Sequence, residues 1–229
     1  MNGVYQNPKY YEIAFSFRDI VGEVDVFEDV IRNYSLIPVS KVFELGCGPA
    51  PHLEELARRN YEYLGLDLSP EMLAYAETKA QAIKASARFH QADMTDFELT
   101  EQVDFAFVLL GSLQAKNTAE LVSHFDSVGR VLKSGGLYLL DWCINFPPNT
   151  EESESWEMAK GPAKVKTTYQ TKLIHPVEQV TEETLTLEIK DAGERDVIRE
   201  TWVRREIYLQ EFLMFIANRK DFEFIGWWN

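Results

Sequence analysis

The 229-residue sequence has few cysteines, a shortage of positive charge and no long apolar run. Its two cysteines, Cys47 and Cys143, are too few for a disulfide framework. Lysine and arginine number 23 against 37 aspartates and glutamates, so the formal charge is −14. This balance argues against a nucleic-acid partner, because nucleic-acid-binding proteins carry basic surfaces. The longest apolar run, residues 105–110, is far shorter than the roughly 20 residues of a membrane span.

Other common signals are missing as well. The first residues contain neither the basic nor the apolar segment of a signal peptide. CxxC, HExxH, GxSxG and P-loop patterns do not occur. Among the histidines, His52 is expected to cap or pack the first helix of the α/β part, and His124 to lie on the solvated side of its helix. We therefore expect a cytoplasmic protein with reduced thiols, no metal site, and neither nucleic acid nor membrane as a partner.

The first 150 residues alternate between two patterns. Short apolar runs rich in β-branched and aromatic residues predict buried strands, and between them apolar residues recur at helical spacing. This alternation predicts βαβ units and a mainly parallel sheet with helices on both faces. The predicted strands are residues 41–45, 61–66, 87–90, 104–109 and 136–140, and the predicted helices are 52–60, 69–84 and 118–132.

The remainder of the chain changes character. An acidic run at residues 151–155 indicates a solvated loop and a boundary. Residues 161–208 alternate between apolar and polar side chains with a glycine turn at 190–193, which predicts an antiparallel hairpin set. A helix over 210–218 and a final strand over 222–228 are expected to complete the α/β part.

A glycine loop follows the first predicted strand. Gly46 and Gly48 would let the backbone approach a ligand closely at the start of a helix, although a tight strand-to-helix turn is the simpler interpretation. Asp67 follows the second strand, 19 residues after Gly48, near the spacing of a ribose-binding acid. Pro51 occupies the place of the third glycine of a dinucleotide motif, and Glu44 would repel a diphosphate. These two residues argue against a nicotinamide oxidoreductase and favour a cationic ligand.

Five segments then appear in a characteristic order. They are VFELGCGPAPHLEEL, GLDLSPEML, HQADMTDF, VDFAFVLLGSL and LKSGGLYLLD, within residues 40–145. This series resembles the motifs of the class I S-adenosylmethionine-dependent methyltransferases. The resemblance implies an α/β, doubly wound, seven-stranded Rossmann-like sheet whose last strand is antiparallel, with an antiparallel β insertion after strand five. It also implies S-adenosylmethionine as the cofactor.

By this resemblance, the glycine loop lines the methionine part of the cofactor and Glu44 reaches its amino group. Asp67 accepts hydrogen bonds from the ribose hydroxyls, and Asp93 takes the adenine amino group, although Asp93 could instead cap a turn. An N-terminal helical cap would place an aromatic ring against the sulfonium and an arginine against the cofactor carboxylate. Alternatively, this segment is an amphipathic helix that packs on the edge of the sheet. The implied cofactor-binding residues are Tyr11, Arg18, Glu44, Gly46, Cys47, Gly48, Asp67, Leu68, Met72, Asp93, Met94 and Leu109.

The methyl acceptor is less well defined. Short segments of the sequence are similar to those of small-molecule N-methyltransferases that act on amino sugars and glycine-type amines. In some of these enzymes a histidine base follows strand four, but residues 113–116 contain no histidine. Asp141 and Tyr208 are candidate catalytic groups, with Glu206 and Tyr11 as further candidates, and Trp142 could wall the acceptor site. A purely structural role is an open alternative for Asp141 and Trp142.

The resemblance implies three parts of the chain. Residues 1–40 would form the helical cap, residues 41–150 and 209–229 the cofactor-binding core, and residues 151–208 an acceptor lid or dimer element. We expect methyl transfer to a nitrogen or oxygen of a small molecule by in-line displacement, with positioning as the main source of catalysis. The alternative is a regulatory or interaction protein that binds the cofactor without transferring its methyl group. A homodimer is left open.

Overall fold

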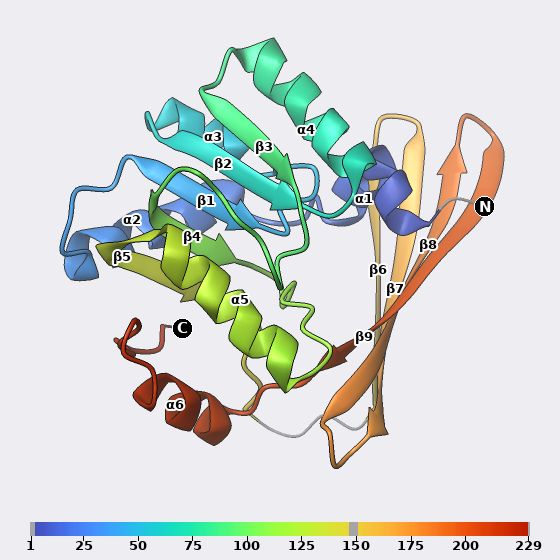
Figure 1. The fold of residues 1–229 in the computed structure, drawn as a ribbon. Helices are drawn as coiled ribbons and strands as arrows, with labels where there is room; N and C mark the ends of the chain where they lie inside the picture. The colour runs from blue at the N-terminus through green and yellow to red at the C-terminus, as the bar shows by residue number, and fades with distance from the viewer. Residues whose placement is uncertain (1–2, 147–150, 229) are drawn as a thin grey trace.

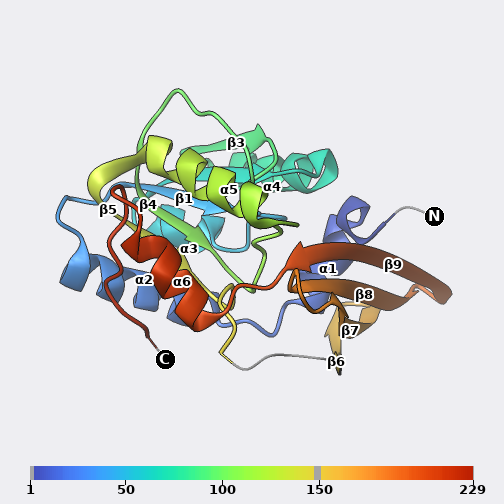
Figure 2. The same ribbon diagram turned by 60° about the horizontal axis from the view of Figure 1, so that its bottom comes forward.

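In the computed structural model, residues 3–146 and 151–228 are described. Five parallel strands form a central sheet in the order β3-β2-β1-β4-β5. A separate antiparallel sheet follows in the order β6-β7-β8-β9 and stands beside the first (Figures 1 and 2). The strands of the central sheet are β1 (Lys41–Leu45), β2 (Glu62–Asp67), β3 (Ala87–Gln91), β4 (Val103–Val108) and β5 (Leu132–Leu140).

Helices cover both faces of the central sheet, as the alternating pattern predicts. One face packs against α2 (Ile20–Tyr34), α3 (Leu53–Arg58) and α4 (Pro70–Ile83). The other face packs against α5 (Thr118–Val131) and α6 (Leu209–Ala217). The doubly wound, Rossmann-like prediction is therefore confirmed, and so are the helix positions. Ser69 caps α4 by accepting a hydrogen bond from the amide of Met72 at 3.2 Å, ahead of Pro70 in the first turn.

The prediction of seven strands is wrong, because the central sheet has five among the described residues. Residues 222–228 form no strand; their aromatic side chains pack instead. The ring of Trp227 lies 4.8 Å from that of Phe224, and the ring of Trp228 lies 5.1 Å from that of Tyr34. The prediction of a loop over 151–155 is also wrong, since these residues begin β6.

The second sheet is confirmed as an antiparallel insertion after strand five. One of its faces packs against the N-terminal segment, which contains η1 (Val4–Gln6) and α1 (Pro8–Ala14). The indole nitrogen of Trp156 donates to the carbonyl oxygen of Ala14 at 2.7 Å and so ties the sheet to α1. The strands are β6 (Glu151–Lys160), β7 (Ala163–His175), β8 (Val180–Asp191) and β9 (Glu194–Arg205).

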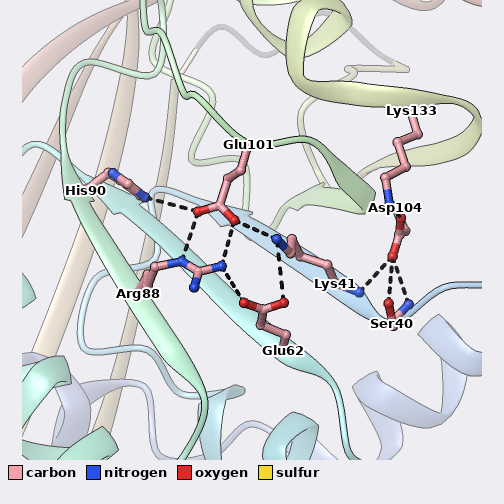
Figure 3. Close-up of polar contacts among 8 residues, drawn as sticks. All are labelled: Ser40, Lys41, Glu62, Arg88, His90, Glu101, Asp104 and Lys133. Atoms are coloured by element: carbon pink, nitrogen blue, oxygen red, sulfur yellow. Dashed lines mark hydrogen bonds and ion pairs between the residues drawn. The ribbon is translucent and has the colours of Figure 1, made fainter.

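Charged side chains order the amino ends of the central strands (Figure 3). Asp104 is 1% exposed and accepts hydrogen bonds from the amides of Ser40 and Lys41 at 2.9 and 2.8 Å, just where β1 begins. Lys133 supplies the compensating charge at 2.6 Å. Further ion pairs at this edge join Lys41, Glu62, Arg88, Glu101 and His90. The charged side chains at the amino ends of the strands therefore stabilise the fold, and the carboxyl ends are where a ligand site can form.

His124 is fully buried, which contradicts its expected solvated position. Its Nδ1 donates to the carbonyl oxygen of Met94 at 2.7 Å, so Nε2 accepts from the hydroxyl of Tyr138 at 2.6 Å. Both bonds are satisfied by the neutral imidazole, and burial lowers the pKa of His124 to about 4. Neutral His124 thus connects α5, β5 and the turn after β3.

This burial makes stability depend on pH. The pKa of His124 falls from 6.5 when unfolded to about 4 when folded, so its contribution is complete above pH 6.5 and is lost as the pH falls through 4. The loss amounts to about 3 kcal/mol. We expect the difference in unfolding free energy between wild type and His124→Gln to shrink by that amount from pH 7 to pH 4, measured by urea denaturation. Parallel curves for the two proteins would contradict the assignment.

Candidate active site

Two glycines shape the turn between β1 and α3. Gly46 and Gly48 have φ of +68° and +51°, in the left-handed region that favours glycine. A Cβ on Gly46 would lie 2.8 Å from Cε of Met94, so the end of that side chain would also have to move. The amides of Gly46 and Cys47 donate to the carbonyl oxygen of Leu66 at 2.7 and 2.9 Å. The turn is therefore fixed to the carboxyl end of β2.

Asp67 ends β2 beside this turn. One carboxylate oxygen accepts from the amide of Gly48 and the other from the amide of Ser69, both at 2.8 Å. Burial raises the pKa of Asp67, and the amide hydrogen bonds offset part of that effect. Each carboxylate oxygen can accept more than one hydrogen bond, so Asp67 can also receive hydroxyl groups of a ligand.

A cavity of about 50 Å³ lies between the turn and the N-terminal segment. Tyr11 and Phe15 cover it from α1 and the residue that follows, with ring centres 4.6 Å apart. Leu109, Leu110 and Ser112 form a wall just after β4. The remaining lining residues are Glu12, Arg18, Glu44, Gly46, Cys47, Gly48, Pro49 and Pro51. Seven of the twelve cofactor-binding residues expected from the sequence thus meet at one cavity, with Asp67 bonded to its rim.

Glu44 belongs to a buried chain of charged groups. Its two carboxylate oxygens contact Nδ1 of His52 at 2.8 Å and the hydroxyl of Tyr63 at 2.5 Å. The Nε2 of His52 lies 2.8 Å from the carboxylate of Glu23, which also accepts from Nε of Arg18 at 3.0 Å. His52 therefore packs between two carboxylates, and its side chain does not cap α3.

The protonation of this chain follows from its contacts. Burial opposes a charge on His52, but Glu44 and Glu23 outweigh burial and raise its pKa. Burial likewise opposes the charge on Glu23, yet His52 and Arg18 lower its pKa to about 2. Each nitrogen of His52 has a carboxylate oxygen 2.8 Å away, so an imidazolium would donate to Glu44 on one side and to Glu23 on the other. Arg18 is thereby fixed in the cavity wall.

The residues expected on the adenine side of the cofactor do not line the cavity. Asp93 accepts hydrogen bonds from the amide and hydroxyl of Thr95 at 2.8 and 2.7 Å, which is the capped-turn arrangement. The side chain of Met94 lies over Gly46. Leu68 is 66% exposed after β2, whereas Met72 is fully buried in α4 and does not line the cavity.

The three expected catalytic residues are not brought together. Asp141 accepts a hydrogen bond from the amide of Leu110 at 3.1 Å beside the cavity wall, and burial raises its pKa. Trp142 is 80% exposed, so it does not wall an acceptor site in this arrangement. Tyr208 precedes α6 as its N-terminal capping residue and is absent from the described cavity lining. The additional candidate Glu206 is buried elsewhere, against Arg204 and Asn145.

Sequence reasoning missed several residues of this region. Phe15, Glu12 and Ser112 line the cavity, and His52 organises its acidic wall. Phe15 follows Tyr11 by one helical turn, a spacing that could have indicated a shared face. The partners of His52 come from positions 29 residues before and 8 residues before it, and no local pattern indicates such a pairing.

The fold is a doubly wound, Rossmann-like α/β domain, and the cavity lies at the carboxyl ends of its parallel strands. The sequence profile of a family described as a methyltransferase domain matches residues 42–136. This part of the chain is similar to that family, and it contains both the glycine turn and Asp67.

Individual proteins show the same likeness. A dTDP-3-amino-3,4,6-trideoxy-α-D-glucopyranose N,N-dimethyltransferase of Streptomyces venezuelae is 27% identical over 125 residues, which are 54% of this chain and 51% of that protein. The structure of Streptomyces venezuelae DesVI superposes with a TM-score of 0.74 at 20% identity, over 87% of this chain and 82% of that one.

A second structure, of CalS10, an amino pentose methyltransferase from Micromonospora echinaspora with bound S-adenosylmethionine, gives a TM-score of 0.72 at 22% identity, over 90% of this chain and 86% of that one. At these identities, the two structures show a common fold. The chain spans about half the length of the curated relatives it matches.

We expect the buried charge chain to be strongly stabilising. His52→Leu would leave Glu44 and Glu23 without their shared partner and lower the unfolding free energy by about 3–5 kcal/mol, measured by urea denaturation at pH 7. A further Glu44→Gln change should restore part of the loss, because it removes one uncompensated buried charge. His175→Leu, at an exposed position, is the control and should change stability by about 0.5 kcal/mol at most. A His52→Leu loss no larger than this control would contradict the analysis.

Proposed function

We propose that the chain transfers a methyl group from S-adenosylmethionine to a nitrogen or oxygen of a small-molecule acceptor. The observation that carries this proposal is the meeting of the glycine turn, Asp67 and an aromatic cover around one cavity at the carboxyl ends of adjacent parallel strands. The names of the Streptomyces and Micromonospora proteins favour an amine nitrogen on a sugar-like molecule. They give no support to the alternative of a binding protein without transferase activity.

The residues present fit this ligand. The left-handed glycine turn lets main-chain atoms approach the methionine part, and the buried carboxylate of Asp67 suits the two ribose hydroxyls. Arg18 donates to Glu23 through Nε and Nη2, so its Nη1 is the group to meet the ligand carboxylate. Glu44 faces the same cavity and suits the ligand's amino group.

Two aromatic rings suit the sulfonium charge. Tyr11 and Phe15 cover the cavity, and each ring can contribute about 0.5–2 kcal/mol to binding a cation. When bound, S-adenosylmethionine supplies an electrophilic methyl group. The protein's task is then to exclude water and to hold the acceptor atom about 3–3.5 Å from that methyl in line with the bond that breaks. Asp141, beside Leu110, is the expected catalytic residue that lies nearest to the cavity wall.

The cavity is smaller than its proposed ligand. Sites for ligands of this size enclose about 300–1,000 Å³, whereas the described cavity has about 50 Å³. The glycine turn is fixed to β2 by main-chain bonds, so the cover formed by Tyr11 and Phe15 is the part that must shift. The fluorescence of Trp156 should change when this cover moves, because the ring of Trp156 lies 5.7 Å from that of Phe15 and its indole nitrogen donates to the carbonyl oxygen of Ala14.

The proposed function predicts how tightly the ligand binds to wild type and to a variant of Asp67. We expect S-adenosylhomocysteine to bind wild type with a micromolar Kd and Asp67→Ala at least about 100-fold more weakly, because hydrogen bonds to a charged group contribute about 1.5–3 kcal/mol each. The measurement is calorimetric titration, with NADH as a ligand that should not bind. Asp29→Ala, on the exposed side of α2, should bind like wild type. Equal affinity of all three proteins would refute the assignment of Asp67.

The proposed function also predicts that the cover formed by Tyr11 and Phe15 moves when the ligand binds. Addition of S-adenosylhomocysteine should change the tryptophan fluorescence of wild type, and the change should disappear in Trp156→Phe because Trp156 packs against Phe15. Trp142→Phe removes an exposed indole and should retain the change. A change of the same size in Trp156→Phe and wild type would contradict a movement of Phe15 against Trp156.

A further inference from the structure

A polar cluster is buried on the inner face of the antiparallel sheet. Glu183 on β8 is 3% exposed, and the register places Thr171 on one side of it and Trp202 on the other. Thr181, two residues earlier on the same face, lies opposite Arg204. Farther along the sheet this face is mainly apolar, with Val165, Leu187 and Ile198 in the core beside the buried Thr167. The polar end of the face lies toward the central domain, where Arg204 contacts Gly111.

Several atoms of this cluster lack hydrogen bonds within the described chain. They are the hydroxyl oxygens of Thr171 and Thr181, Oε1 of Glu183 and Nε of Arg204. The two threonines are 9% and 2% exposed. Nε of Arg204 lies 2.8 Å from Oε1 of Glu183 in ion-pair contact but without hydrogen-bond alignment. Each unsatisfied buried polar group costs about 1–3 kcal/mol, and a bound ligand with matching groups would recover that cost.

The charges in the cluster do not balance. Arg204 faces two carboxylates, Glu183 at 2.8 Å and Glu206 at 3.7 Å, and both are under 5% exposed. Glu206 also accepts from the side-chain amide of Asn145, whereas Glu183 accepts from the indole of Trp202 at 2.6 Å. Burial raises the pKa of Glu183, with Arg204 opposing and Glu206 adding to the effect. By formal charge, one guanidinium faces two carboxylates, so a cation placed here would balance the charges of Arg204, Glu183 and Glu206.

The cluster borders the candidate active site along two routes. Nη1 of Arg204 donates to the carbonyl oxygen of Gly111 at 2.6 Å, and Gly111 stands between the cavity-lining residues Leu110 and Ser112. The ring of Tyr5 lies 6.0 Å from the ring of Tyr11 and 6.0 Å from the ring of Trp202. An aromatic wall thus leads from the cavity to the indole that bonds Glu183.

We propose that Glu183 determines the acceptor specificity of this protein by binding the ammonium group of an amine that also carries hydroxyls. This inference rests on the proposed function and narrows it from nitrogen or oxygen to nitrogen. The bound ammonium gives one proton to the carboxylate of Glu183, and the neutral amine then attacks the methyl group as the bond to sulfur breaks. An ammonium would balance the formal charge and supply donors to Oε1 of Glu183. Thr171 and Thr181 offer hydroxyl groups to the rest of the molecule. An alcohol in the same place would leave Glu183 uncompensated.

The test uses two sugars that differ in one group, glucosamine and glucose. Each is titrated calorimetrically into protein saturated with S-adenosylhomocysteine. We expect glucosamine to bind wild type at least about 30-fold more tightly than glucose, and to bind Glu183→Gln about 30-fold or more weakly than wild type, because a lost partner of a buried charge costs 2–5 kcal/mol. Glu182→Gln is the matched control, since Glu182 adjoins Glu183 on β8 but is exposed on the opposite face.

The outcomes separate the two proposals. Absence of S-adenosylhomocysteine binding to folded wild type overturns the proposed function and this inference with it. Normal S-adenosylhomocysteine binding together with equal affinity of Glu183→Gln and wild type for glucosamine, or with no glucosamine binding at all, overturns the inference alone. If Glu183→Gln does not fold, the ratio of the two sugar affinities in wild type decides: a ratio below about 10-fold overturns the role of Glu183, given the cost of losing a buried charge's partner.

Discussion

The parallel pairing of β1 with β2 and β4 is the constraint on which the site depends. Parallel strands end at the same edge, so the glycine turn after β1, Asp67 after β2 and Leu109 after β4 meet although the sequence separates them widely. The opposite edge is held by Asp104 and its partners, which fix where β1 begins. Since β1 is held at both ends, the turn has one conformation to offer a ligand.

A chain of buried charges extends this order to the N-terminal segment. Glu44 sits on β1, His52 before α3 and Glu23 on α2, and Arg18 joins them from the segment after α1. The imidazolium of His52 links two carboxylates that would otherwise repel each other in a buried place. The cover of the cavity is therefore anchored at Arg18, while the rings of Tyr11 and Phe15 pack against each other and Trp156 holds their helix through Ala14.

The elements that could be predicted from the sequence are those that depend on residues close together along the chain. Strands β1 to β4 and helices α4 and α5 follow from periodicity and capping, and the turn from its glycines, because each depends on neighbouring residues. The expected strand at 222–228 failed because alternating aromatic residues pack equally well without a ladder, as Trp227 does on Phe224. The prediction for His124 was wrong because its partners are distant in sequence, and the pairing of His52 with Glu23 could not be predicted for the same reason. Trp142 and Tyr208 lie beyond a strand end, where no periodicity fixes a side chain.

Arg204 connects the two sheets, and this bond has a thermodynamic consequence. It holds the carbonyl of Gly111, in the loop that walls the cavity, while the next residue, Arg205, donates its amide to the carbonyl of Ala115 at 2.7 Å. A displacement of the antiparallel sheet therefore also displaces the loop after β4. If a ligand on one side stabilises one position of this loop, a ligand on the other side encounters the same preference. Linkage requires that each then alter the affinity of the other by the same factor, so the coupling carried by the contacts of Arg204 and Arg205 would appear equally in both affinities.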